Sequence, residues 1–335
     1  MKLSVNVKQL IALLAIAFKR RRKVLIKGQP GIGKTDIVKH ACKIAGALVI
    51  FMHPAISDPT DFKGMPAITN QGTEAHFLPF GDLMALISAD KLTVCFIDDI
   101  GQAPQGVQAA LMQLIQERRV NGHRISEHVV FCGATNDTSH RSGVSGILET
   151  VKSRFDTIVE LVPDVDDWCS WACGVGNMPP ELIGFIRFRP DLLNDFKPTR
   201  ELTNSPSPRT VAAVGEWVND GITDLPTLAG AAGAGFASEF IGFLKLYRSL
   251  PSIDQILLDP SGATVPKEPA ALYAVGAALI RKFTPKSARA VFTYAVRMPK
   301  ENEVVVVLDG LRTNDELRHT PEFTQWAIRN GGVLS

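Results

Sequence analysis

Five short apolar runs, rich in β-branched and aromatic residues, alternate with helical patterns in the first half of the chain. The runs are Val24 to Lys27, Ala47 to Met52, Leu92 to Ile97, Val129 to Ala134 and Thr157 to Leu161. Strands that alternate with helices predict an α/β fold with a five-stranded parallel sheet covered by helices on both faces. In such folds, ligands bind beyond the carboxyl ends of the strands.

Helical patterns precede and follow these runs. Leu10 to Phe18 predicts a core-facing helix that ends in the basic cluster Lys19 to Lys23, since cations suit the negative end of a helix dipole. After Pro163 strand-like runs largely stop, apart from the isolated β-rich run Val304 to Leu308. We therefore expect two domains, residues 1–163 and a helical domain over residues 164–335.

Three segments between these elements carry turn signals. Pro54 to Gly81 contains several Pro and Gly residues and is predicted to be a loop-rich insert. The pair Asn121-Gly122 predicts a tight hairpin turn just before the fourth strand. Gly230 to Gly235 indicates either a hinge or a close helix–helix crossing, and the pattern does not separate the two.

Composition adds few constraints. The 335 residues are 45% hydrophobic with a net charge of +2, as in an ordinary globular protein, and the total charge does not favour a nucleic-acid or membrane partner. The apolar run Leu10 to Phe18 is too short to span a bilayer, and its charges follow it, unlike those of a secretory signal. Five scattered cysteines predict reduced, buried thiols and a cytoplasmic location.

The first run ends in a motif that matches the phosphate-binding loop G-x-x-x-x-G-K-[ST] at every fixed position. Its residues are Gly28, Gln29, Pro30, Gly31, Ile32, Gly33, Lys34 and Thr35, and we add Asp36 of the following helix to the predicted nucleotide-binding set. Glycines let backbone N–H groups converge on phosphate oxygens, and the helix dipole behind them favours the negative charge. Lys34 is expected to reach the β- and γ-phosphates of ATP, and Thr35 to help hold Mg²⁺.

The third run ends in the carboxylate pair Asp98-Asp99. Hard cations prefer carboxylate oxygen, so Asp98 is the predicted Mg²⁺ ligand beside Thr35. Asp99 stands where a general base would polarise the attacking water.

Three further polar residues are candidates for the reaction. Asn136 follows the fourth run and is predicted to reach the γ-phosphate or the water. Arg154, before the fifth run, is a candidate arginine finger that enters the site of a neighbouring subunit. Arg209 lies in the first turn of a helix that Ser207 caps, where a cation suits the dipole poorly. A contact with phosphate is therefore a plausible role for Arg209.

Taken together, these motifs resemble the AAA+ ATPases and, within them, the MoxR-like branch. Asp98-Asp99-Ile100-Gly101-Gln102-Ala103-Pro104 looks like that branch's Asp-Glu-Ile-Asn-x-Ala-Pro run, and Ser207-Pro208-Arg209 looks like its second sensor. The resemblance covers about residues 8 to 220. It implies an AAA+ core with a C-terminal helical lid, a ring that is usually a hexamer, and ATP sites between subunits. It also implies that the Pro54 to Gly81 insert and the hairpin at Asn121 face the pore or the client.

One departure from the family opens two interpretations of function. Asp99 replaces the family's Glu and is one methylene shorter, and a misplacement of ~1 Å can cost about a hundredfold in rate. The first interpretation is an ATP-driven remodeller or chaperone acting on a partner protein, such as one with a von Willebrand factor A domain. The second is a nucleotide-gated binding module with slow hydrolysis, whose partner is a protein or, through Lys19 to Lys23, a nucleic acid.

Overall fold

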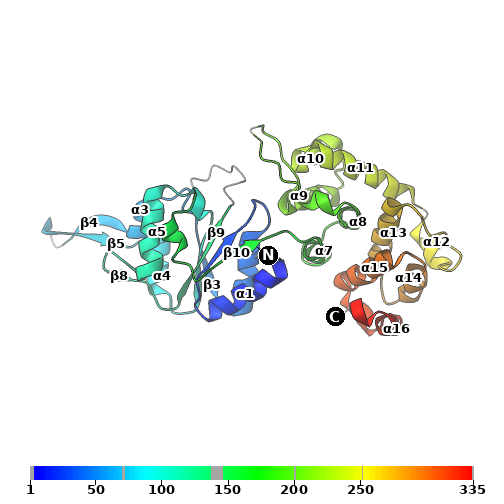
Figure 1. Ribbon diagram of the computed structural model, residues 1–335, viewed down its shortest axis with the longest axis horizontal. Coiled ribbons are helices and arrows are strands. Elements are labelled where there is room, and N and C mark those ends of the chain that lie inside the picture. Colours follow the sequence, from blue (N-terminus) through cyan, green and yellow to red (C-terminus); the bar gives the residue numbers. More distant parts are fainter. Residues whose placement is uncertain (1–3, 70–71, 137–145, 200, 251, 334–335) are drawn as a thin grey trace. The chain divides into compact units, whose positions relative to one another are not determined.

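The computed structural model describes residues 4–69, 72–136, 146–199, 201–250 and 252–333 (Figure 1). The chain divides into two compact units, Met1–Val162 and Pro163–Ser335. The first unit contains the sheet and the second is helical.

The first unit is built on a parallel sheet of six strands. In spatial order these are β1 (Ser4–Val5), β10 (Thr157–Leu161), β2 (Val24–Lys27), β9 (Val129–Thr135), β6 (Thr93–Ile97) and β3 (Leu48–Met52). The five predicted runs are all strands, and the parallel α/β fold is confirmed. The predicted strand count is wrong by one. Strand β1 has only two residues, which is too short to leave an alternating pattern in the sequence.

Helices cover both faces of this sheet, because successive strand residues point to opposite sides. Val94 and Phe96 of β6 pack in a core with α1 (Val7–Lys19) and α2 (Lys34–Ala45). Cys95 and Ile97 pack in a second core with α3 (Pro59–Lys63), α4 (Gly81–Ser88) and α5 (Gln105–Glu117). Short elements η2 (Ile100–Gln102) and α6 (Glu149–Lys152) complete the unit. The sheet is thus a rigid middle layer that fixes where its strands end.

Two antiparallel hairpins extend the unit beyond the sheet. Strands β7 (Arg119–Val120) and β8 (His123–Arg124) flank Asn121 and Gly122, whose φ values of 45° and 87° suit the predicted tight turn. The prediction of a loop-rich insert is wrong in part. It contains α3 and a hairpin of β4 (Met65–Thr69) and β5 (Glu74–Leu78), seen at the edge of Figure 1. All of β5 is exposed, so no buried face marks it in the sequence.

The second unit is built from helices and short 3₁₀ turns. In chain order they are α7 (Val165–Cys173), α8 (Pro180–Phe188), η4 (Pro190–Leu193), α9 (Pro208–Asn219), α10 (Leu225–Ala232), α11 (Ala234–Ser249), α12 (Ile253–Leu258), α13 (Pro269–Arg281), α14 (Ala288–Ala295), α15 (Lys300–Thr313), η5 (Asp315–His319), α16 (Pro321–Arg329) and η6 (Gly331–Val333). The β-rich run Val304 to Leu308 lies inside α15, where Val306 and Val307 are buried, so packing overrides strand propensity.

The glycine-rich segment Gly230 to Gly235 is a sharp break between α10 and α11. Gly233 has φ 92°, and a Cβ atom there would come within 2.8 Å of the Asn204 carbonyl oxygen. Only glycine combines that backbone angle with so close an approach. The break is therefore a tight fit against a neighbouring segment.

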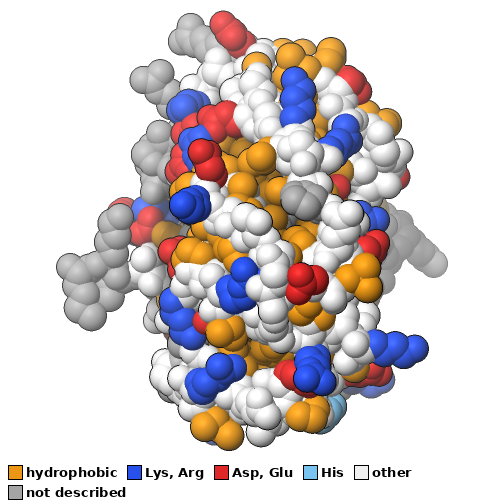
Figure 2. Space-filling view, turned by 90° about the vertical axis from the view of Figure 1, so that its right-hand side faces the viewer, with side chains coloured by type: hydrophobic (Ala, Val, Ile, Leu, Met, Phe, Trp, Pro, Cys, Tyr) orange, Lys and Arg blue, Asp and Glu red, His pale blue; other side chains and the backbone are white. Residues whose placement is uncertain are grey.

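Charged side chains of both signs are mixed on the face of the molecule that Figure 2 shows. On the face shown in Figure 2, Lys and Arg lie among Asp, Glu and apolar side chains, and neither sign dominates. All five cysteines are free thiols; four are buried and Cys173 is half-buried. In the described parts of the chain, no helix has the length and apolar character needed to cross a membrane.

Candidate functional site

The carboxyl ends of four neighbouring strands meet at one edge of the sheet. Lys27 pairs with Thr135, Ile97 with Gly133, and Met52 with Ile97. The residues that follow these strands are the phosphate-binding loop, Asn136, the Asp98-Asp99 pair and His53. The sheet register therefore brings together, side by side, residues separated by more than a hundred positions in the sequence.

The loop from Gly28 to Thr35 joins β2 directly to α2. Gly33 occupies the N-cap position of α2 with φ 87°, a left-handed conformation that glycine adopts at no steric cost. Because glycine has no side chain, the cap position leaves space in front of the first helical N–H groups. A Cβ atom on Gly28 would come within 2.5 Å of the Ile32 side chain, so the turn is also close-packed. This geometry suits an anion at the N-terminus of a 12-residue helix.

Lys34 is almost entirely buried, at 7% exposure, and its ammonium group lies inside the loop. Nζ donates to the carbonyl oxygens of Gly28 (3.1 Å) and Gln29 (3.0 Å) and to Oδ1 of Asn136 (2.7 Å). A buried ammonium is costly unless its donors are used, and here three of them are. The Lys34 ammonium group is thus held where it would contact a phosphate bound in the loop.

The carboxylates after β6 have separate partners. Thr35 Oγ1 donates to Asp98 Oδ2 at 3.0 Å, so the two predicted Mg²⁺ ligands lie side by side. Asn136 Nδ2 donates to Asp99 Oδ1 at 2.9 Å. The Asn136 amide therefore bridges Lys34 and Asp99, with one atom toward each.

Asp99 has an unusual backbone and a perturbed acidity. Its φ of 53° and ψ of 37° are left-handed, a conformation that Asp tolerates better than most residues. Burial and then the neighbouring Asp98 charge raise the pKa of the Asp99 carboxyl, while Lys34 lowers it. A carboxylate with raised basicity is a better proton acceptor, which suits a general base.

Two predicted residues of the first unit lie away from this cluster, and a third belongs to the second unit. Asp36 is in the first turn of α2, but its carboxylate is 83% exposed and faces Lys39. Arg154 precedes β10, at the amino end of the sheet, and its Nε is buried without a hydrogen-bond partner among the described residues. Arg209 belongs to the second unit, in the first turn of α9 behind the N-cap Ser207, so its approach to a nucleotide stays a prediction.

Two contributors were not predicted from the sequence. His53 follows β3, beside the Asp98-Asp99 pair, and its charge lowers the pKa of Asp99. The signal was a polar residue directly after a predicted strand. Gln108 on α5 is fully buried; its Nε2 donates to the Ala103 and Gly146 carbonyls and its Oε1 accepts from Leu148 N. It ties the segment after Asp99 to the one leading to α6.

Comparison with known proteins agrees with this geometry. Residues 23–155 match the AAA domain family, dynein-related subfamily. "Chaperone MoxR1" of Mycobacterium tuberculosis is 30% identical over 154 residues, which are 44% of this chain and 38% of that protein. Over this part of the first unit the chain resembles an AAA domain of the MoxR type. The match spans less than half the length of that curated relative.

Solved structures are similar at a lower level. The Holliday junction branch migration motor RuvB of Thermotoga maritima aligns with a TM-score of 0.40 and 19% identity, covering 82% of this chain and 80% of that chain. NtrX from Brucella abortus aligns with a TM-score of 0.38 and 15% identity, covering 95% and 64%.

Proposed function

We propose that this chain binds Mg·ATP at the loop from Gly28 to Thr35 and hydrolyses it. The observation that carries the proposal is the bridge from Lys34 through the Asn136 amide to Asp99, with Thr35 beside Asp98. This arrangement provides a phosphate-binding cation, a pair of hard oxygen ligands and a base within one edge of the sheet.

The donor set fits the cofactor. Thr35 and Asp98 offer one hydroxyl and one carboxylate, the oxygen ligands that Mg²⁺ takes in combination with phosphate oxygens. When bound, Mg²⁺ supplies neutralisation of phosphate charge. Lys34 holds the β- and γ-phosphates, Asp99 accepts the proton of the attacking water, and Asn136 orients both Lys34 and Asp99.

Arg154 supports a site that two copies of the chain complete. Thr157 pairs with Val24, four residues before Gly28, which corresponds to roughly 13 Å at about 3.3 Å per residue. Arg154 precedes Thr157 and therefore lies beyond the opposite end of the sheet from the loop of its own chain. We propose that it enters the site of a neighbouring copy in a ring, as an arginine finger does, and that Arg209 acts on nucleotide from the lid. A hexamer is the stoichiometry we propose.

We further propose that the cycle remodels or activates a protein client, in the manner that the relative's name, chaperone, suggests. The β7–β8 hairpin contacts both α3 and the β4–β5 hairpin: Asn121 Nδ2 donates to the Lys63 carbonyl of α3 at 2.7 Å, and a His123 ring nitrogen lies 2.8 Å from the Phe77 carbonyl oxygen of β5. Exposed apolar side chains on β4–β5, Met65 (53%) and Ile68 (76%), suit contact with a client. A von Willebrand factor A domain protein in the cytoplasm is the client we propose.

Calorimetry of Mg·ATP binding tests the proposal. The purified chain should bind Mg·ATP with a dissociation constant in the micromolar range, and Lys34→Ala should weaken binding by at least about tenfold, since a charged hydrogen bond contributes about 1.5–3 kcal/mol. Lys39→Ala is the matched control, because Lys39 is exposed on the same helix and pairs with Asp36. Equal affinity of the wild type and Lys34→Ala would remove the proposed site.

A second candidate is a nucleotide-gated binding module with slow hydrolysis. It is favoured by the short Asp99 side chain and by a basic surface: Arg21 and Arg124 lie near enough to Arg118 that, after burial, their charges lower its pKa. Single-turnover assays decide. If Asp99→Glu hydrolyses ATP faster than the wild type, the result favours the binding module. If the wild type hydrolyses ATP rapidly and Asp99→Asn abolishes hydrolysis, the result favours the remodeller. Binding of a nucleic acid would weaken steeply with salt.

A further inference from the structure

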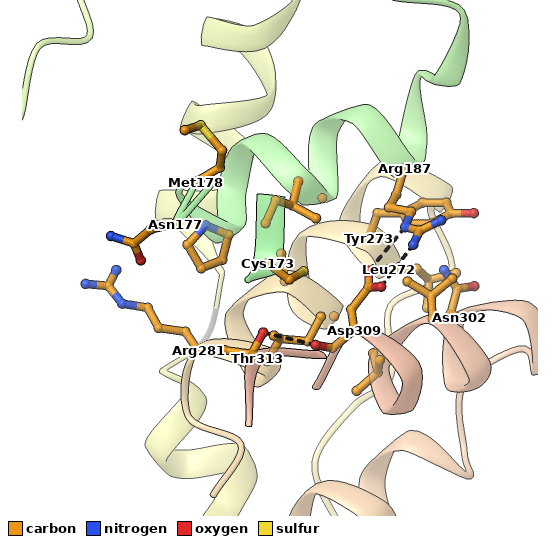
Figure 3. A pocket seen from close by; sticks show the side chains of 18 residues that line it. Cys173, Asn177, Met178, Arg187, Leu272, Tyr273, Arg281, Asn302, Asp309 and Thr313 are labelled. Atoms are coloured by element: carbon orange, nitrogen blue, oxygen red, sulfur yellow. Dashed lines mark hydrogen bonds and ion pairs between the residues drawn. The ribbon is translucent and has the colours of Figure 1, made fainter. Parts of the chain in front are cut away.

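A cavity of about 260 Å³ lies inside the helical unit, among helices α7, α8, α13 and α15 (Figure 3). Its walls are mostly apolar, with contributions from Ile183, Leu272 and Val306. At about 30 Å³ per molecule, this volume corresponds to roughly nine waters, far more than a single structural water site requires. The lining belongs entirely to the second unit, so the cavity is separate from the nucleotide site.

Three charged residues line the cavity: Arg281 is exposed, whereas the side chains of Arg187 and Asp309 are buried and neutralise each other. Arg187 donates to both carboxylate oxygens of Asp309, Nε at 3.1 Å and Nη2 at 2.9 Å, and Asp309 is completely buried. Figure 3 shows the pair at one end of the cavity. A buried, bidentate pair of this kind leaves no net charge for a ligand to match. The part of an occupant that lies at this end of the cavity is therefore neutral.

Asn302, on α15, is a buried polar residue of the lining whose side chain the fold leaves unused. It is 7% exposed and lines the cavity at the same end as Arg187 and Asp309 (Figure 3). Within the described parts of the chain its side-chain amide makes no hydrogen bond. The amide also offers one acceptor and two donors in a fixed place.

From these features we propose that the cavity is a binding site for a neutral, mostly apolar small molecule that carries a carboxamide-like donor and acceptor, which the Asn302 amide recognises. The apolar walls supply affinity by removing the ligand's hydrocarbon surface from water. Asn302 supplies orientation and selectivity, since a ligand that pairs with it satisfies a buried group. The Arg187–Asp309 pair excludes charged ligands because neither partner can be released without leaving the other buried alone.

Cys173 provides a built-in reporter of occupancy. It lines the cavity and is the cysteine of the chain that is half-buried, while the other four are buried. Burial raises the pKa of its thiol to about 12, so alkylation is slow and can be followed over hours. A molecule in the cavity should slow it further.

The test uses three probes of similar size on the full chain: benzamide, toluene and benzoate. Affinity is measured by ligand-detected NMR and by the shift in melting temperature, and occupancy by the rate of Cys173 alkylation. We expect benzamide to bind saturably and to slow alkylation at least threefold, toluene to bind more weakly, and benzoate to bind at least tenfold more weakly than benzamide.

Asn302→Leu should reduce benzamide affinity about fivefold to tenfold, the equivalent of about one hydrogen bond, and leave toluene binding unchanged. Asn302→Ala is the second variant if the leucine does not fit. Asn330→Leu is the matched control: Asn330 is equally buried, but its Nδ2 donates to the Trp326 carbonyl at 2.8 Å, outside the cavity. No saturable binding of benzamide or toluene would mean a water-filled cavity and would overturn the proposal. Equal benzamide affinity in both Asn302 variants would overturn the role of Asn302.

Discussion

Lys34 Nζ lies 2.7 Å from Oδ1 of Asn136. The other end of the same amide donates to Asp99, so the two polar atoms of Asn136 are committed to opposite charges. A γ-phosphate that enters the loop competes for Lys34 and changes the balance of this bridge. Asn136 therefore connects phosphate binding at Lys34 to the hydrogen bonding of Asp99.

Asn136→Ala should separate binding from hydrolysis. Lys34 and the loop remain, so Mg·ATP affinity should stay within a few-fold of wild type, whereas losing one positioned donor should slow hydrolysis by about 10²–10³-fold. Single-turnover kinetics and calorimetry on the same samples measure both. Asn219→Ala is the control, because Asn219 is exposed and donates to the Asn177 carbonyl in the helical unit. A loss of affinity that matches the loss of rate would contradict this role.

Asp99→Asn should slow ATP hydrolysis and stabilise the folded state at pH 7. Removing a general base slows hydrolysis by about 10²–10⁴-fold. Burial and Asp98 raise the pKa of Asp99, so the ionised carboxyl destabilises the folded state. The raised pKa of Asp99 therefore stabilises the folded state at pH values below the ordinary pKa of a carboxyl. This stabilisation is lost as the pH rises through the higher pKa that Asp99 has in the folded state. Asparagine carries no charge and accepts the left-handed φ of 53°. The metal-free variant should therefore melt at a higher temperature than wild type at pH 7, and at a similar temperature at pH 3.

Thermal unfolding in EDTA at both pH values measures this difference. Asp99→Ala is the useful contrast, since it also removes the charge but places alanine in a left-handed conformation that costs about 1–2 kcal/mol. If Asp99→Asn melts below wild type at pH 7, the interpretation of the raised pKa is wrong.

The sequence predicted that these polar residues gather at one edge of the sheet, because one physical rule connects the segments that carry them. Carboxyl ends of parallel strands meet, so the loop after β2 and the carboxylates after β6 could be placed together without coordinates. The bounds of β2 and β10 agree with the prediction, since both are apolar runs between polar turns. The contact of Asn136 with both Lys34 and Asp99 depends on side-chain rotamers, which periodicity does not encode.

Other features depend on long-range packing and could not be predicted. Strand β1 exists only because Ser4 and Val5 pair with the end of β10. Val304 to Leu308 has strand propensity but is helical, because one side of α15 packs into the core of the second unit. Asn302 gave no sequence signal, since a polar residue near a helix start is ordinarily solvated.

Gln108→Leu should destabilise the first unit. The buried amide makes three hydrogen bonds to backbone groups, and leucine of similar size leaves those groups unpaired, at about 1–3 kcal/mol for each group that stays dry. We expect a loss of at least about 2 kcal/mol in urea unfolding. Gln113→Leu is the control, because its amide donates to the exposed Glu117 carboxylate on the same helix. Equal stability of the two variants would show that the hydrogen bonds of Gln108 do not contribute to the free energy of unfolding.

Asp309→Ala should lower the free energy of unfolding by more than Gln108→Leu or Gln113→Leu does. It leaves the Arg187 guanidinium buried without its main partner, and breaking such pairs costs about 3–5 kcal/mol. The double variant Arg187→Met with Asp309→Leu removes both charges and should recover most of that loss. Asp166→Ala is the control, since Asp166 also pairs with Arg187 but is 69% exposed. Urea unfolding of the full chain measures the series, and a double variant no better than Asp309→Ala would contradict a pairwise cause.

Arg154 and Lys34 should complement each other across subunits. Arg154→Ala keeps an intact loop but lacks the finger, whereas Lys34→Ala lacks the loop cation but keeps Arg154. Each variant alone should hydrolyse ATP at least about 10³-fold more slowly than wild type, the contribution typical of an arginine finger. Mixing the two regenerates complete sites wherever an Arg154→Ala loop meets the Arg154 of a Lys34→Ala copy.

In a head-to-tail ring, each interface takes the loop from one copy and Arg154 from the next. When equal amounts mix at random, half of the loops and half of the Arg154 side chains are intact, so about one interface in four is complete. The mixture should thus recover about a quarter of wild-type activity, and the recovery should require concentrations at which copies associate. Arg119→Ala, an exposed arginine on the β7–β8 hairpin, is the control and should keep full activity alone. If the mixture is no more active than the two variants measured separately, Arg154 acts within its own chain or not at all, and the proposal of a site shared between subunits fails.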